Sequence, residues 1–129
     1  MTESQSLTMV ESAVLIALGG FAGANVRYAA DLVLPALSAT LAANVAGSAL
    51  LGFVLYEEAL VGAFSRQLRV ALGTGFLSSL TTYSTFAVQT AAASPAVAAL
   101  NVVGNYALGF LGVALGRWAA LRLAAEVRA

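Results

Sequence analysis

The sequence contains no cysteine, no histidine and no lysine, and only two of its 129 residues are proline. Without cysteine and histidine there are no disulfides, no thiol or imidazole catalysis and no usual transition-metal ligand sets. Charged residues make up 9% of the chain, whereas a soluble domain carries roughly 25%. Six arginines are balanced by six acidic residues, so the chain offers no basic surface for nucleic acid. These absences exclude a soluble enzyme, and we expect a protein without enzymatic activity.

The residues that are present indicate a membrane protein. Hydrophobic residues make up 60% of the chain, and the mean hydropathy is +0.90. We therefore expect one all-α integral membrane domain over residues 1–129, located in the cell (plasma) membrane and crossing it several times. No basic stretch precedes the first apolar segment, so a cleaved signal peptide is not expected.

The positions of the charges predict the membrane spans. Three runs lack charge altogether and cover residues 12–26, 32–56 and 70–116. A spanning helix needs about 20 apolar residues, so the second run forms one span and the third forms two, divided at Ser94–Pro95. The first run spans the membrane if Arg27 reaches polar surroundings. The sequence thus predicts four helices, at about 9–30, 36–57, 67–91 and 96–120.

The third predicted helix has an unusual centre. Six of the nine residues from Ser78 to Phe86 are serine or threonine. Such hydroxyls compete for backbone hydrogen bonds and bend or break helices. A helix broken inside the membrane offers carbonyl groups to a cation and N–H groups to an anion. The alternative is a continuous helix whose hydroxyls bond back to its own carbonyls.

Three other polar features lie within the spans. Asn44 sits in the middle of an apolar run, either as an interhelical hydrogen-bond partner or along a wet path. Tyr83 and Phe86 share a helix face, and their positive ring edges suit an anion, although two core aromatics would look the same. Arg27 is either an interfacial anchor or a fixed charge that attracts anions. The pair Asn101 and Asn105 also shares a face, in a structural or a functional role.

Four segments of the chain carry recognisable motifs: residues 19–28 (GGFAGANVRY), 40–47 (TLAANVAG), 75–86 (GFLSSLTTYSTF) and 101–109. Taken in order, they resemble signatures of the CrcB/Fluc family of fluoride channels. The third-helix string, residues 75–86, is the most specific of them. The resemblance covers about residues 13–118, nearly the whole chain.

This resemblance implies a small four-helix subunit that pairs antiparallel into a dimer with two pores and exports fluoride passively, protecting the cell from its toxicity. It also implies a sodium ion at the dimer centre, held by the backbone carbonyls of Ser78 and Thr81. By the same motifs, the expected fluoride-pore residues are Asn44, Tyr83, Ser84, Thr85, Phe86 and Arg27. The chain departs from the family where it has Ser78 and Ser79 in place of the usual glycines and Tyr83 in place of a phenylalanine.

Two alternatives remain beside the fluoride channel. A small multidrug-type exporter would need a carboxylate inside the membrane, and Glu11 at the start of the first helix is the best candidate. The chain could also be a non-conducting partner of a heterodimeric channel. With four spans, five of the six arginines fall on one side and only Arg27 on the other, which predicts a fixed orientation with the termini inside. The dimer partner is therefore either a second copy or an oppositely oriented homologous subunit.

Overall fold

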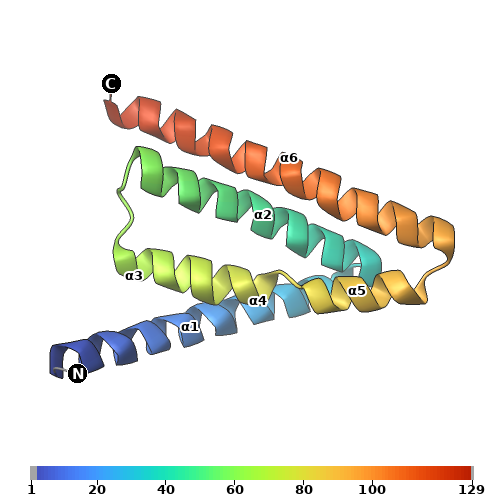
Figure 1. Ribbon diagram of the computed structural model, residues 1–129, viewed down its shortest axis with the longest axis horizontal. Coiled ribbons are helices and arrows are strands. Elements are labelled where there is room, and N and C mark those ends of the chain that lie inside the picture. The colour runs from blue at the N-terminus through green and yellow to red at the C-terminus, as the bar shows by residue number, and fades with distance from the viewer. Residues whose placement is uncertain (1–2, 129) are drawn as a thin grey trace.

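The computed structural model describes residues 3–128, and every regular element within them is a helix. Three of these helices are long and apolar enough to cross a membrane, and they lie within α1 (Glu3–Val33), α2 (Ala36–Leu60) and α6 (Pro95–Arg128). The all-α class predicted from composition is confirmed. Figure 1 shows both chain ends at one end of the molecule, together with the turn that follows α2.

The segment between the turn after α2 and the start of α6 is helical but divided. It consists of α3 (Arg66–Arg69), the π-helix η1 (Val70–Leu77), α4 (Ser78–Leu80) and α5 (Tyr83–Ala92). Thr81 and Thr82 between α4 and α5 have extended backbone, with ψ angles of 157° and 124°. The Thr81 hydroxyl donates to the Leu77 carbonyl at 2.9 Å, as expected where hydroxyls compete with helical bonding. The break predicted from the hydroxyl-rich string is therefore present.

Three helices extend beyond their predicted C-terminal ends. The first reaches Val33 instead of residue 30, and the last reaches Arg128 instead of residue 120. The second continues past Glu57 to Leu60, and Gly62, at φ 67°, then ends it. Charge marks the limit of the hydrocarbon, whereas Glu and Arg remain good helix formers outside it. Hydropathy therefore located the three long apolar helices but cut them short.

Glycines set the distances between neighbouring helices. A Cβ added at Gly19 or Gly23 of α1 would collide with backbone carbonyls of η1, and one at Gly116 of α6 would collide with α2. At Gly112 an added Cβ would lie 2.9 Å from a carbonyl oxygen of α2. Helices in lipid associate through such small residues because the surrounding lipid is as apolar as their own side chains. As a result, α1 lies against η1 and α6 runs alongside α2 (Figure 1).

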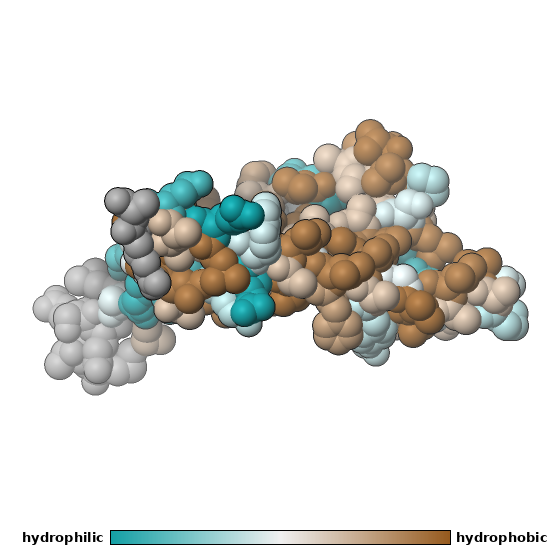
Figure 2. Space-filling model, turned by 90° about the horizontal axis from the view of Figure 1, so that it is seen from above, coloured by the Kyte–Doolittle hydropathy of each residue, from teal (hydrophilic) through white to brown (hydrophobic). Residues whose placement is uncertain are grey.

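Large apolar side chains cover the outside of the molecule instead of filling its centre. The buried cluster is small and consists of Ala43, Leu77 and Leu80, with Phe76 packed against it. Leu18, Leu100 and Phe110 are among many large side chains left exposed. Figure 2 shows apolar residues across the middle of one long face, with hydrophilic residues concentrated near the end where the termini lie. This distribution suits a lipid environment.

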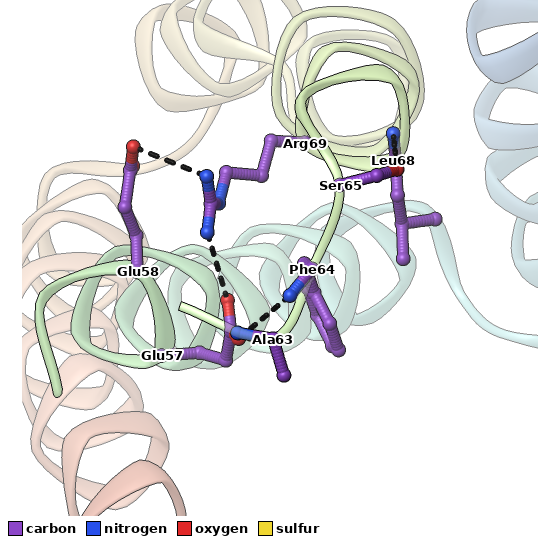
Figure 3. A network of polar contacts seen from close by, with 7 residues as sticks. All are labelled: Glu57, Glu58, Ala63, Phe64, Ser65, Leu68 and Arg69. Atoms are coloured by element: carbon purple, nitrogen blue, oxygen red, sulfur yellow. Dashed lines mark hydrogen bonds and ion pairs between the residues drawn. The ribbon is translucent and has the colours of Figure 1, made fainter. Parts of the chain in front are cut away.

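A buried carboxylate closes the turn between α2 and α3 (Figure 3). The Glu57 side chain is 0% exposed, and its Oε1 accepts hydrogen bonds from the N–H groups of Ala63 at 2.7 Å and Phe64 at 3.0 Å. The guanidinium of Arg69 lies 3.8 Å from Glu57 Oε2 and 3.5 Å from Glu58 Oε1. From the sequence, Glu57 is expected only as the end of the second helix, because two adjacent glutamates after an apolar run look like a solvated helix end.

Candidate functional site

The side chain of Asn44 binds the backbone of Thr82 at the centre of the helix break. The Thr82 N–H donates to Asn44 Oδ1 at 2.9 Å, and Asn44 Nδ2 donates to the Thr82 carbonyl at 3.2 Å. A primary amide presents the same donor and acceptor as a peptide group. Asn44 Oδ1 therefore replaces the helical acceptor that the Thr82 N–H loses. Asn44 Nδ2 adds a second donor to the Thr82 carbonyl, which as the N-cap of α5 already accepts the first hydrogen bond of that helix. This contact stabilises the interruption from a neighbouring helix.

This arrangement frees two carbonyl groups. In a continuous α-helix the Ser78 carbonyl would accept from the Thr82 N–H, and the Thr81 carbonyl from the Thr85 N–H. The first of these donors is bound to Asn44, and the second is bound to Thr82 Oγ1 at 3.2 Å. The carbonyls of Ser78 and Thr81 are thus separated from their helical donors by identifiable competing hydrogen bonds.

A cluster of hydroxyls caps the second half of the broken helix. Thr82 Oγ1 accepts from the Thr85 N–H, donates to Thr85 Oγ1 at 3.0 Å and lies 3.4 Å from Ser84 Oγ. Threonine at a helix N-cap satisfies one of the free N–H groups there. Ser84 and Thr85 are exposed, so their hydroxyls lie at the surface of this single subunit.

A chain of hydrogen bonds leads from the break to α6 and returns to α5. Asn44 Nδ2 donates to Asn105 Oδ1 at 3.1 Å, and Asn105 Nδ2 donates to Asn101 Oδ1 at 3.0 Å. Asn101 Nδ2 then donates to Thr90 Oγ1 at 2.9 Å, and the Thr90 hydroxyl donates to the Phe86 carbonyl at 2.7 Å. The shared face of the two α6 asparagines is thus used for contact with α2 and α5.

Three aromatic rings lie beside this series of hydrogen bonds. The ring centres of Tyr83 and Phe86 are 5.8 Å apart with planes at 47°, and Tyr106 from α6 meets Phe86 edge-on at 6.3 Å and 85°. Phe86 is 7% exposed, whereas Tyr83 is 74% exposed. Tilted and edge-on contacts of this kind direct positive ring edges toward neighbouring groups.

An open cavity of about 580 Å³ joins these features. Its polar and aromatic lining comprises Asn44, Ser48, Ser78, Thr81, Thr82, Tyr83, Phe86, Asn105, Tyr106 and Phe110. Of the residues predicted from sequence, Ser84, Thr85 and Arg27 do not line it. Arg27 is half-buried on α1 and forms no ion pair with the side chains that the structure describes, those of residues 8–127.

The helices that build this site fall within the part of the chain that matches a known protein family. A family model described as CrcB-like protein, Camphor Resistance (CrcB), matches residues 14–117. The chain belongs to the CrcB family. A relative named Fluoride-specific ion channel FluC 1, from Haloarcula marismortui, is 52% identical over 117 residues, which cover 91% of each chain. Another of the same name, from Natronomonas pharaonis, is 51% identical over 105 residues, covering 80% of this chain and 88% of that one.

As a CrcB protein with several long apolar helices, the chain is a multi-pass membrane protein. The match from 14 to 117 contains Arg27, Asn44, the whole broken segment and both α6 asparagines. Sequence reasoning did not single out Thr82 or Thr90. Thr82 could have been recognised from its place in the hydroxyl-rich string, whereas nothing in the sequence distinguishes Thr90 from other span threonines.

Proposed function

We propose that this CrcB protein is a fluoride-selective channel that lets fluoride leave the cell passively and so lowers its toxicity. Relatives 50–52% identical over four fifths or more of the chain are named fluoride-specific ion channels. The structural observation that carries the proposal is the Asn44–Thr82 contact, which holds a helix open beside a set of aromatic ring edges. An exporter that exchanges protons would need a carboxylate inside a span, and the described cavity is lined by none.

The pore is lined by Asn44 and by the groups that follow the break. Both Asn44 N–H bonds are already made, to Thr82 and Asn105, so Asn44 fixes the shape of the path. The groups left for a dehydrated fluoride are the ring edges of Tyr83 and Phe86 and the hydroxyls of Tyr83, Ser84 and Thr85. Arg27 supplies a positive charge at the pore mouth.

The broken segment forms the third of four membrane crossings. Residues 66–92 are 27 residues long and would extend about 40 Å as a helix, against about 30 Å of hydrocarbon. Both termini and the turn after α2 lie at one end, as four crossings require (Figure 1). This segment is not among the three long apolar helices because the break divides it, and its longest element, α5, has 10 residues.

The functional unit is an antiparallel dimer with a sodium ion at its centre. The Ser78 and Thr81 carbonyls fit this ion, because both have lost their helical donors and a hard cation prefers oxygen ligands. Bound there, sodium would supply positive charge that offsets the cost of an anion in a low-dielectric surrounding. The partner is a second copy or an oppositely oriented homologous subunit, and the arginine bias favours the latter.

The direct test is fluoride efflux from liposomes that contain this protein alone, followed with an ion-selective electrode. Rapid fluoride loss without loss of chloride from matched vesicles is the expected result for a selective channel formed by two copies. Efflux that begins only after an oppositely biased CrcB subunit is added would assign the function to a heterodimer. Absence of efflux from folded protein in both preparations would contradict the proposal.

A further inference from the structure

Two arginines at the end of α6 are left without acidic partners. Arg117 and Arg122 follow an uncharged stretch that ends at Gly116, and both are exposed. Among residues 8–127, whose side chains the structure describes, the ion pairs are those of Arg69. These two guanidinium groups therefore remain available to an anionic ligand outside the chain.

Each of the two guanidinium groups instead lies over an aromatic ring. Arg122 is 5.2 Å from the ring centre of Trp118, and Arg117 is 5.3 Å from that of Tyr56 on α2. Stacking uses the face of the planar guanidinium and leaves its N–H edge free. That edge has the geometry for two parallel hydrogen bonds to a phosphate group.

The two arginines lie on different faces of α6. A stripe of small residues is buried at one-turn intervals: Gly112, Gly116, Ala120 and Ala124. At about 100° per residue, Trp118 and Arg122 each lie about 160° from Ala120, on the face away from α2. Arg117 lies only about 60° from Ala120, which agrees with its contact to Tyr56.

We propose that the Trp118–Arg122 face of α6 binds the headgroup phosphate of an anionic phospholipid. Tryptophan favours the level of the headgroups, and here it occurs where the uncharged stretch of α6 gives way to arginines. The view in Figure 2 shows the same change, from an apolar middle to hydrophilic residues near the termini. An anionic lipid is favoured over a zwitterionic one because no headgroup cation offsets its phosphate near Arg122.

Trp118 is the only tryptophan in the chain, so its fluorescence reports on this face alone. The purified full-length protein is reconstituted in vesicles that contain dibrominated phosphatidylglycerol or dibrominated phosphatidylcholine at the same mole fraction. Bromine quenches tryptophan only at close range. We expect phosphatidylglycerol to be enriched about fivefold over phosphatidylcholine beside Trp118.

Arg122→Gln and Arg117→Gln form a matched pair, since each removes one charge from the same end of α6. The expected result is that R122Q brings the two lipids to nearly equal quenching while R117Q leaves most of the preference. Equal quenching of the wild-type protein by both lipids, no quenching by either, or equal losses in the two variants would overturn the proposal. The measurement does not depend on fluoride transport.

Discussion

The amide side chain of Asn44 binds both the N–H and the C=O of Thr82, although the two residues are 38 positions apart in the sequence. A helix interrupted in the membrane must satisfy its freed backbone groups, since lipid offers no hydrogen bonds. Here one side chain from α2 accepts the freed N–H of Thr82, while Thr82 Oγ1 binds the N–H of Thr85. The carbonyls of Ser78 and Thr81 are therefore left without their helical donors. The shape of the site therefore depends on a single interhelical contact.

Replacing Asn44 should damage both the fold and the flux. Asn44→Leu leaves the Thr82 N–H without its acceptor and removes one donor to the Thr82 C=O, so we expect a loss of about 2–4 kcal/mol in the free energy of unfolding. Fluoride flux should fall as well, because the break loses its fixed shape. Unfolding in detergent mixtures, followed by Trp118 fluorescence, measures the first effect, and liposome efflux measures the second.

Asn25→Leu is the matched control for this variant. The Asn25 side chain is exposed and bonds only to the Phe21 carbonyl of its own helix, at 2.8 Å. Its replacement should change neither quantity appreciably. An Asn44→Leu protein as stable and as active as this control would contradict the role given to the Asn44–Thr82 contact.

Phe86→Ile should remove flux more completely than it lowers stability. The ring is almost buried and contacts Tyr83 and Tyr106, but isoleucine fills much of the same volume. We expect a stability loss of about 1–2 kcal/mol, together with abolished fluoride efflux because the positive ring edge is gone. The exposed Phe21→Ile serves as control, and normal efflux from assembled Phe86→Ile protein would argue against the ring-edge mechanism.

Glu57 should contribute much more to stability than its neighbour Glu58. Glu57→Ala leaves two backbone N–H groups of the α2–α3 turn without an acceptor, which should cost about 3 kcal/mol. Glu58 is 55% exposed and makes one ion pair at 3.5 Å, so Glu58→Ala should cost less than about 1 kcal/mol. Detergent unfolding of the two variants side by side tests this prediction. Equal losses in the free energy of unfolding would show that the buried hydrogen bonds of Glu57 stabilise the protein no more than the exposed ion pair of Glu58.

The arginine bias predicts a single orientation in the native membrane. Because the chain has no cysteine, Gln67→Cys and Ala96→Cys introduce unique labelling sites at opposite ends of the proposed bundle. With the termini inside, an impermeant maleimide should label residue 96 from outside and residue 67 only after lysis. Labelling of both cysteines from both sides would show that the chain inserts in two orientations.

The sequence by itself determined the class of protein and much of its layout. Scarce charge and long apolar runs exclude a soluble fold, because so few ionisable groups cannot cover a soluble surface. The hydroxyl-rich string located the interruption now seen at Thr81 and Thr82, since side-chain hydroxyls compete locally with helical bonding. The close approaches at Gly19 and Gly116 likewise agree with what small residues do in lipid. These are local properties that a linear pattern carries.

Only the tertiary structure decided which polar groups meet. Asn44, Thr82 and Asn105 come from three segments, and their spacing in sequence says nothing about the hydrogen bonds that join them. The burial of Glu57 could likewise not be predicted from the sequence. It depends on the turn folding back so that two backbone N–H groups point at one carboxylate. A hydrogen bond requires donor and acceptor to lie within about 3 Å at a suitable angle, and only the packing of whole helices sets such distances.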